Sequence, residues 1–224
     1  IIEYLMIKNI IFDFDGVLVD SEIIVAKSLS RYLKKRNIVF EEKEFAKFVG
    51  NKTIDVVGKL SNIFNIKDKD IFFEDIMLLT KDLYSNELQS INGVEYFLKN
   101  IQQNKYIGSN NIKERIIQGL KKVNLNSFFK FNSIFSFDLV GVPKPNPDIY
   151  LKAIEDSKIN KNETIIIEDS SIGVISGVSA GIKVIGLTAG GHWYNDRSKQ
   201  ELYDAGAYEV VNSYKDMLLL INKL

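Results

Sequence analysis

The chain has 224 residues, of which 46% are hydrophobic, so it can bury a substantial core in one large domain or two unequal ones. Lys plus Arg and Asp plus Glu both number 29, and this balance gives no basic field that would favour nucleic acid as a partner. The absence of cysteine excludes disulfides, thiolate metal sites and thiol nucleophiles, and it fits a cytoplasmic protein.

The N-terminal segment and the apolar runs give no indication of a membrane partner. The first residues, IIEYL, lack the basic flank, apolar stretch and small-residue cleavage site of a signal peptide. Met6 is a candidate natural start, with residues 1–5 as an extension. The longest apolar runs, such as MLLLI at 217–221, are far shorter than the roughly 20 residues of a membrane helix.

Short apolar runs predict the strands of a buried parallel sheet, because most are rich in β-branched or aromatic residues and too short for helices. The runs cover residues 7–12, 106–108, 134–135, 165–167, 184–187 and 209–211. Helical patterns separate the later runs, at residues 111–123, 147–157, 172–181 and 213–224. This alternation predicts an α/β fold with a doubly wound, mostly parallel, Rossmann-like sheet whose strand ends meet at one edge.

The region from residue 20 to residue 92 breaks this alternation with four amphipathic helical patterns and no convincing strand. The patterns are SEIIVAKSLSRYLKKR, EEKEFAKFV, TIDVVGKLSNIF and DIFFEDIMLLTKDLYSNEL. Inserted after the first strand, they predict a small helical domain above the carboxyl edge of the sheet, although a continuous helical layer would give the same periodicity. We expect a catalytic core of residues 1–19 and 93–224 and a helical domain of residues 20–92.

Two predicted strands end in acidic pairs. In NIIFDFDGVLVDSE, Asp13 and Asp15 project to the same face of an extended chain, and Gly16 supplies a turn that lets the backbone approach a ligand. In IIIEDSSIG, Glu168 and Asp169 precede a helix, which alone favours an N-cap. In a parallel sheet, however, both pairs lie at one edge, and crowded carboxylates there require a cation, for which Mg²⁺ is the commonest choice.

Two loops supply candidate partners for an anion. In YIGSNN, Ser109, Asn110 and Asn111 stand where a strand passes into a helix and presents backbone N–H groups, although a simple helix cap has the same sequence.

The second loop, VPKPNPDI, contains all three prolines of the chain around Lys144. Proline fixes its own φ and extends the preceding residue, so Lys144 is presented as a rigid point charge for a phosphate and the carboxylates. A helix-start loop with an incidental lysine is the alternative. Asn146 and Pro147 are expected to be the N-cap and first residue of the next helix.

Four motifs in this order, DFDGVLVD, GSNN, PKPNPDIY and IIIEDSSIGVISG, resemble the haloacid dehalogenase superfamily of phosphohydrolases over nearly the whole chain. The helical insert resembles the type 1 cap of the branch that includes β-phosphoglucomutase, phosphoglycolate phosphatase and sugar-phosphate phosphatases. The later segment TAGGHWYNDRSKQELYDAGAYEVVNS also resembles bacterial phosphatases grouped with 6-phosphogluconate phosphatase.

The resemblance implies a role for each motif. Asp13 would be the nucleophile that forms an aspartyl-phosphate, and Asp15 would be the general acid and base. The implied Mg²⁺ ligands are the Asp13 carboxylate, the Asp15 backbone carbonyl and Asp169. Glu168 would either bind the ion directly or contact its ligands. The implied contacts to the phosphoryl group are Gly16, Ser109, Asn110 and Lys144.

Asp15 also separates this chain from two kinds of relative, because metal-free dehalogenases lack a second aspartate and P-type ATPases have threonine there. In the cap, FVGNKTIDVV resembles the substrate-specificity loop, with Lys52 as the candidate contact to a sugar or acid group. A solvated surface lysine is the alternative. His192, the only histidine, is expected to serve loop structure rather than catalysis.

The expected function is a Mg²⁺-dependent phosphatase that acts through an aspartyl-phosphate on a small phosphorylated metabolite, a sugar phosphate or sugar-acid phosphate. Two alternatives stay open: a phosphomutase of the β-phosphoglucomutase type, and a catalytically silent binding or regulatory homologue. We expect a small phosphorylated substrate, no nucleic-acid or membrane partner, and a cytoplasmic monomer or weak dimer.

Overall fold

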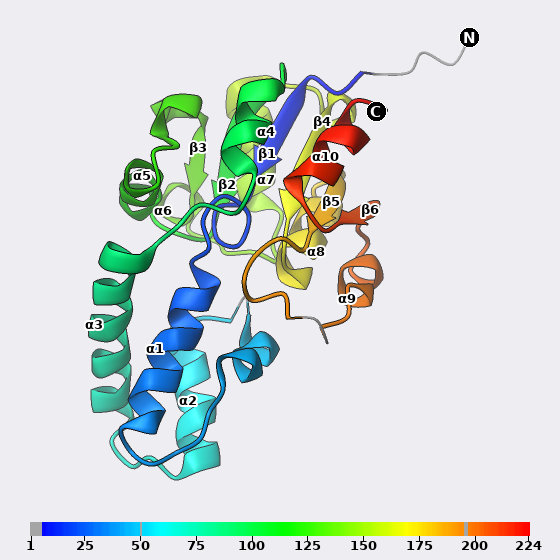
Figure 1. Cartoon of the computed structure of the whole chain (residues 1–224). Coiled ribbons are helices and arrows are strands. Elements are labelled where there is room, and N and C mark those ends of the chain that lie inside the picture. The colour runs from blue at the N-terminus through cyan, green and yellow to red at the C-terminus, as the bar shows by residue number, and fades with distance from the viewer. Residues whose placement is uncertain (1–5, 50, 195–196) are drawn as a thin grey trace.

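The computed structural model describes residues 6–49, 51–194 and 197–224, so the extension proposed for residues 1–5 lies outside the described residues. Within the described part, one sheet of six parallel strands has the order β3-β2-β1-β4-β5-β6 (Figure 1). The strands are β1 (Asn9–Phe12), β2 (Asn104–Ser109), β3 (Ile134–Ser136), β4 (Thr164–Glu168), β5 (Lys183–Leu187) and β6 (Glu209–Val211). The predicted doubly wound parallel sheet is therefore confirmed.

The central strands are apolar on both faces because helices cover both sides of the sheet. In β1, Ile10 and Phe12 belong to one apolar cluster, whereas Ile11 between them belongs to another on the opposite face. The same alternation occurs in β4, where Ile166 packs on the face opposite to its neighbours Ile165 and Ile167. These side chains are fully buried, which explains the nearly continuous apolar sequence of the two strands.

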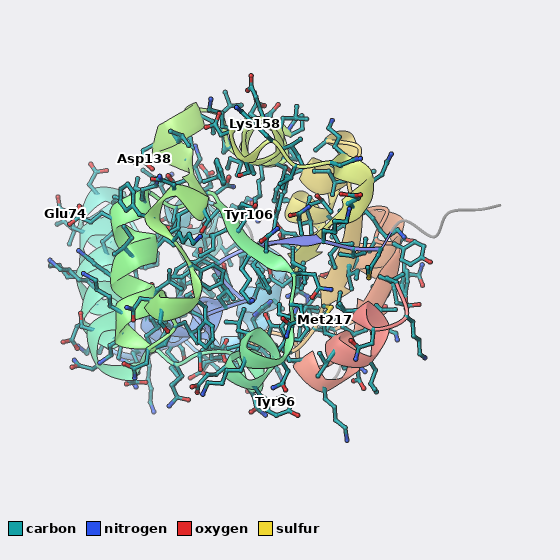
Figure 2. All side chains as sticks on the ribbon, turned by 90° about the horizontal axis from the view of Figure 1, so that it is seen from above. Glu74, Tyr96, Tyr106, Asp138, Lys158 and Met217 are labelled. Atoms are coloured by element: carbon teal, nitrogen blue, oxygen red, sulfur yellow. The ribbon has the colours of Figure 1, made fainter. Side chains whose placement is uncertain are left out.

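Two helical layers enclose the sheet. One face packs against α4 (Val94–Asn100), α5 (Lys113–Lys122) and α10 (Tyr214–Ile221), and the other against α7 (Asp148–Ser157), α8 (Ser171–Ser179) and α9 (Gln200–Asp204). Figure 2 shows Tyr96 of α4 and Met217 of α10 on one side of the sheet, and Lys158 at the end of α7 on the other. Shorter segments are α6 (Phe137–Val140) and the 3-10 turns η2 (Asn126–Phe128), η3 (Phe131–Ser133) and η4 (Lys161–Glu163).

The region predicted as a helical domain forms α1 (Glu22–Lys34), a 3-10 segment η1 (Glu42–Phe48), α2 (Thr53–Phe64) and α3 (Lys69–Glu87). Figure 1 shows α1, α2 and α3 together beyond the end of the sheet to which β1 leads. They bury an apolar cluster of their own, whose members include Leu29, Phe45, Leu60 and Phe72. We keep the division into residues 1–19 plus 93–224 and residues 20–92 as a proposal.

Several local predictions differ from the structure. EEKEFAKFV forms a 3-10 segment of seven residues rather than an α-helix, because a segment this short with Phe45 as its only buried residue gains little packing to hold α-helical turns. The helix after the lysine loop begins at Asp148 with Pro147 as its N-cap, one residue later than predicted, because the Asn146 side chain instead donates to the Pro143 carbonyl (3.0 Å).

No helix in the described ranges is both long and apolar enough to cross a membrane.

Candidate active site

Strand pairing places the two acidic motifs next to each other. β1 pairs with β4, with Phe12 opposite Ile167, and the Asp13 N–H donates to the Ile167 carbonyl (2.9 Å). Asp13 therefore leaves the sheet beside Glu168, at the point between β1 and β4 where the strand order reverses. Ligands of doubly wound folds bind outside the carboxyl ends of the strands at such a point. The prediction that both acidic pairs lie at one edge is confirmed.

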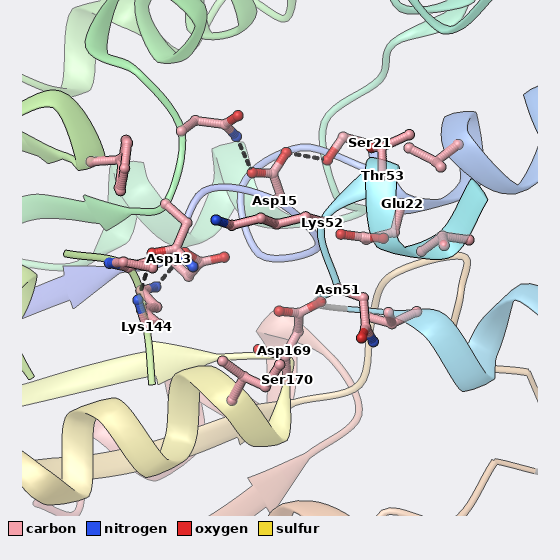
Figure 3. Close-up of a pocket in the computed structure, with 18 of the residues that line it drawn as sticks. Asp13, Asp15, Ser21, Glu22, Asn51, Lys52, Thr53, Lys144, Asp169 and Ser170 are labelled. Atoms are coloured by element: carbon pink, nitrogen blue, oxygen red, sulfur yellow. Dashed lines mark hydrogen bonds and ion pairs between the residues drawn. The ribbon is translucent and has the colours of Figure 1, made fainter. Parts of the chain in front are cut away.

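Three buried carboxylates converge at this edge. One oxygen from each of Asp13, Glu168 and Asp169 lies within 4.8 Å of the others. The Lys144 ammonium lies between two of these groups, with Nζ 2.6 Å from Asp13 Oδ1 and 2.6 Å from Glu168 Oε1 (Figure 3). All four side chains are shielded from solvent, so the charges interact in a medium less polar than water.

Lys144 is held by several independent contacts. Its backbone N–H donates to Asn110 Oδ1 (2.8 Å), and its ammonium lies 4.8 Å from the centre of the Tyr150 ring. The Tyr150 hydroxyl donates to Glu168 Oε1 (2.7 Å), the oxygen that also accepts from Lys144. Burial alone lowers the pKa of Lys144, but the adjacent Asp13 and Glu168 carboxylates outweigh it and raise the pKa. The lysine therefore stays charged at neutral pH.

The charges of the cluster fit a divalent cation bound by oxygen. Three ionised carboxylates and one ammonium give this group a net charge of −2. Burial is the main cause that raises the pKa of Asp13 and of Asp169, and each is raised further by neighbouring carboxylates. Within the described residues, buried Asp169 Oδ2 also has no aligned hydrogen bond. Mg²⁺ prefers oxygen ligands, and its two charges would match this deficit.

Gly16 makes room for the cluster. Its φ of +70° is a backbone conformation that favours glycine, and a Cβ there would overlap the Asp169 carboxyl group. The Gly16 N–H donates to the Val19 carbonyl (2.8 Å), so in this structure it closes a turn rather than pointing to a ligand. The predicted contact between Gly16 and phosphate stays a prediction.

The Asp15 carboxylate points away from the three-carboxylate group. The Ser21 hydroxyl donates to Asp15 Oδ1 (2.5 Å), and the Asn111 amide donates to Oδ2. Figure 3 shows Asp15 beside Ser21, on the side of the cavity that faces the helical region. No role for Ser21 was predicted from the sequence, whereas its hydrogen bond orients the carboxyl group of the predicted general acid and base.

The loop after β2, which contains Asn110 and Asn111, forms part of the wall of the cavity in front of the carboxylates. Ser109 is buried, and its Oγ accepts a hydrogen bond from the Asn111 N–H (3.1 Å). Asn110 joins this loop to the lysine loop through the bond from its Oδ1 to the Lys144 N–H. The phosphate contacts predicted for Ser109 and Asn110 stay predictions.

A cavity of about 300 Å³ opens between the carboxylates and the helical region. Figure 3 shows the Lys52 side chain extending from the loop before α2 toward Asp13 and Asp15, so the structure brings this predicted substrate contact to the site. The lining includes residues for which the sequence analysis proposed no role: Glu22, Asn51 and Arg115. The sequence pattern does not single out these three residues as site residues, since each is one polar residue in an amphipathic or loop segment.

Glu22, the first residue of α1, titrates near neutral pH. Burial raises the pKa of its carboxyl group from 4.5 to about 7, and the nearby Asp15 and Asp169 carboxylates raise it further. A group whose pKa is higher in the folded state contributes stability that is complete below its unfolded pKa. That contribution is lost as the pH rises through the folded value.

We expect Glu22→Gln to become more stable relative to the wild type as the pH rises. Between about pH 5 and about pH 8 the difference in unfolding free energy should grow by roughly 2 kcal/mol, allowing for partial exposure of the side chain. Urea unfolding of both proteins at the two pH values measures it. Glu95→Gln, at an exposed position on α4, serves as the control and should show no such trend. A pH-independent difference for Glu22→Gln would contradict the assigned burial.

His192 lies against the carboxylate cluster. It is fully buried in the loop after β5, and its Nε2 lies 2.9 Å from Asp169 Oδ2. Burial lowers the pKa of His192 to about 4, so the ring is neutral at pH 7. His192 was expected to serve loop structure rather than catalysis; it does lie in a loop, and its ring contacts the predicted metal ligand Asp169.

Comparison with known proteins identifies the family. The model of the haloacid dehalogenase-like hydrolases matches residues 10–187, which include the acidic motifs, the lysine loop and the helical insert. The chain belongs to the haloacid dehalogenase-like hydrolase family. The resemblance inferred from the four motifs is confirmed, and so is the predicted enzyme class, a phosphatase-type hydrolase.

Curated relatives include members of the family with known names. The 6-phosphogluconate phosphatase of Escherichia coli is 24% identical over 192 residues, which cover 83% of this chain and 85% of that protein. The bifunctional riboflavin kinase/FMN phosphatase of Arabidopsis thaliana is 26% identical over 215 residues, which cover 94% of this chain. This chain spans 54% of the length of that second relative.

Solved structures of family members match nearly the whole chain. A conserved haloacid dehalogenase-like protein of unknown function from Agrobacterium tumefaciens has a TM-score of 0.89 at 30% identity, and the match covers 97% of this chain and 98% of that one. A haloacid dehalogenase family hydrolase from Deinococcus radiodurans, solved with bound phosphate and sodium, has a TM-score of 0.84 at 26% identity and covers 98% of both chains.

Proposed function

We propose that the protein is a Mg²⁺-dependent phosphatase that hydrolyses a small phosphorylated metabolite, a sugar phosphate or sugar-acid phosphate, through a covalent phosphate on Asp13. The observation that carries this proposal is the buried group of Asp13, Glu168 and Asp169, with Lys144 in contact with Asp13. The 6-phosphogluconate phosphatase relative supports the substrate class, and the phosphate bound in the Deinococcus structure supports a phosphate ligand.

The cation would be held by the Asp13 carboxylate, Asp169 and the Asp15 backbone carbonyl. Glu168 already accepts hydrogen bonds from Lys144 and Tyr150, so it orients the lysine and adds negative charge beside the ion. When bound, Mg²⁺ supplies positive charge that stabilises the phosphoryl oxygens in the transition state. Lys144 supplies a further positive charge on the same side of Asp13.

In the first step, an Asp13 oxygen attacks phosphorus. A bond forms between that oxygen and phosphorus while the phosphorus–oxygen bond of the ester breaks. Asp15 gives its proton to the departing alcohol oxygen, so the alcohol leaves neutral. Ser21 and Asn111 hold the Asp15 carboxyl group in the cavity beside the substrate.

In the second step, Asp15 takes a proton from a water molecule, which attacks the phosphorus of the aspartyl-phosphate. The bond to Asp13 breaks, inorganic phosphate leaves, and both aspartates return to their starting protonation states. The helical region encloses the cavity with Lys52, Thr53 and Val56, which limits access of bulk water during the first step.

Lys52→Ala is expected to weaken substrate binding without unfolding the protein. Lys52 is exposed and lines the cavity, so removal of its charge should raise KM by roughly tenfold while the melting temperature stays unchanged. Steady-state kinetics on the preferred substrate measures the effect. Lys69→Ala, an exposed lysine at the start of α3, is the control. Equal KM values for the Lys52 variant and the wild type would refute the assigned contact.

Release of inorganic phosphate tests the function directly. The protein should release phosphate from a panel of phosphorylated sugars and sugar acids with Mg²⁺ and lose this activity with a chelator. Isomerisation of a hexose 1-phosphate without net phosphate release would instead identify a phosphomutase. Binding of these compounds without either reaction would identify a silent binding homologue. Activity that is unaffected by removal of divalent cations would contradict the proposed cofactor.

A further inference from the structure

The loop after β5 places an imidazole directly behind Asp169. His192 Nε2 lies 2.9 Å from Asp169 Oδ2, which is a hydrogen-bond distance, although the N–H direction is not aligned with the oxygen. Among the described residues, neither ring nitrogen of His192 nor Asp169 Oδ2 has a hydrogen-bond partner. Both residues are almost completely buried, so water does not supply the missing partners easily.

Two glycines leave the space that the imidazole occupies. A Cβ at Gly16 would lie 2.9 Å from His192 Cε1, and a Cβ at Gly190 would lie 2.6 Å from the same atom. The loop itself is fixed, because the Gly191 N–H donates to both oxygens of Asp20 (3.0 and 3.2 Å) and the Trp193 N–H donates to the Gly190 carbonyl (3.0 Å). The ring of His192 therefore packs tightly against Gly16 and Gly190 and lies next to Asp169.

A purely structural role does not explain this residue. A buried polar group without a partner is unfavourable, so an apolar side chain would fill the same space with a gain in stability. The imidazole instead turns one nitrogen toward the carboxylate that is the predicted metal ligand. Ligands of metal ions commonly need such outer partners, which fix the orientation of the ligand.

We propose that His192 is a positioning residue: its Nε2–H binds Asp169 Oδ2 and fixes the rotation of the carboxyl group for the divalent cation. Fixing Oδ2 also fixes the direction of Oδ1, because the two oxygens share one plane. Both the neutral Nε2–H tautomer and the protonated ring donate from this atom, so the role does not depend on the charge of the ring. The proposal rests on the proposed function only in requiring a cation at the cluster.

Three substitutions separate this role from packing. Glutamine places an amide nitrogen at the same bond distance from Cβ as Nε2, whereas asparagine reaches only the position of Nδ1, and leucine offers no donor. The measurement is isothermal titration of Mg²⁺ into the full chain without substrate. We expect His192→Asn and His192→Leu to bind Mg²⁺ about 10–100-fold more weakly than the wild type, and His192→Gln to retain most of the affinity.

The activity of the same variants gives a second readout. The concentration of Mg²⁺ that gives half-maximal activity should rise in His192→Asn and His192→Leu, while kcat at saturating Mg²⁺ stays close to that of the wild type. Equal Mg²⁺ affinities of the wild type and the three His192 variants would overturn the assignment. An equal loss of Mg²⁺ affinity in His192→Gln and His192→Asn would overturn it as well. If the wild type hydrolyses substrate but binds no divalent cation, the positioning role is also rejected.

Gly190→Ala provides an independent test that keeps the histidine. The new methyl group would lie 2.6 Å from Cε1 and 2.7 Å from Nδ1, so it must displace the ring. We expect its Mg²⁺ affinity to fall as in His192→Asn. Gly58→Ala, where a Cβ meets no atom within 4 Å, is the matched control and should bind Mg²⁺ normally. Normal Mg²⁺ binding by Gly190→Ala would refute the role of His192 while leaving the proposed function intact.

Discussion

Asp13→Asn is expected to abolish phosphate release while the protein stays folded. The amide is a poor nucleophile, so the covalent phosphate cannot form, and kcat should fall by roughly 10⁴-fold or more. The fold should tolerate the change because asparagine has the same shape and keeps an oxygen that can accept from Lys144. Burial and neighbouring carboxylates raise the pKa of Asp13, so removal of its charge also relieves repulsion in the metal-free protein.

Phosphate release and thermal unfolding, each measured for both proteins, separate the two effects. Without Mg²⁺ the melting temperature of Asp13→Asn should equal or exceed that of the wild type. Asp70→Asn, at an exposed position in the first turn of α3, should leave both activity and melting temperature unchanged. Substantial turnover by purified Asp13→Asn would show that another group accepts the phosphate, and the assigned nucleophile would be wrong.

Lys144→Met is expected to lose both activity and much of its stability. The lysine lies 2.6 Å from Asp13 Oδ1 and 2.6 Å from Glu168 Oε1, and both carboxylates are buried. Removal of one partner leaves buried charge uncompensated, which costs about 3–5 kcal/mol in unfolding free energy. Urea unfolding at neutral pH without divalent cations measures this loss. Lys152→Met, which breaks an exposed ion pair with Asp156, is the control and should change stability little.

The deficit of Lys144→Met should shrink as the pH falls. The pKa of Asp13 is raised above its unfolded value, so stability linked to its proton is complete at low pH and lost as the pH rises. Lys144 opposes that rise, so its removal raises the pKa of Asp13 further. The difference from the wild type should therefore be smaller near about pH 5.5 than near about pH 7.5. A deficit that grows on acidification would contradict the charge arrangement.

The central sheet and the position of the acidic motifs were predictable because they follow from local pattern and general topology. Runs such as III at residues 165–167 are apolar on both faces, as expected for a covered parallel strand. Once two such strands are parallel, their carboxyl ends share an edge, which places Asp13 and Glu168 on the same edge. Their direct proximity comes from the pairing of β1 with β4, which the sequence did not predict. The family motifs added roles to these residues that geometry alone does not give.

Other features depend on contacts that no local pattern reveals. The short helices α4, α6 and α9 have too few turns for a clear period. Packing on the two faces of the sheet holds α4 and α9 in place. The partners of Asp15 come from two segments that meet only in the folded chain, through Ser21 and Asn111.

The contact between His192 and Asp169 could not be predicted, because a loop residue carries no periodic signal. The placement of His192 after a strand, directly following Gly190 and Gly191, was the available clue, since loops at the carboxyl ends of parallel strands line the site.

The structure of a crystal grown with Mg²⁺ and inorganic phosphate would show directly whether the three carboxylates form a phosphoryl-transfer site. We expect one ion with oxygens of Asp13 and Asp169 at about 2.0–2.1 Å, and a phosphate beside the second oxygen of Asp13 within reach of Lys144. An ion bound elsewhere, or a phosphate that does not approach Asp13, would contradict this expectation.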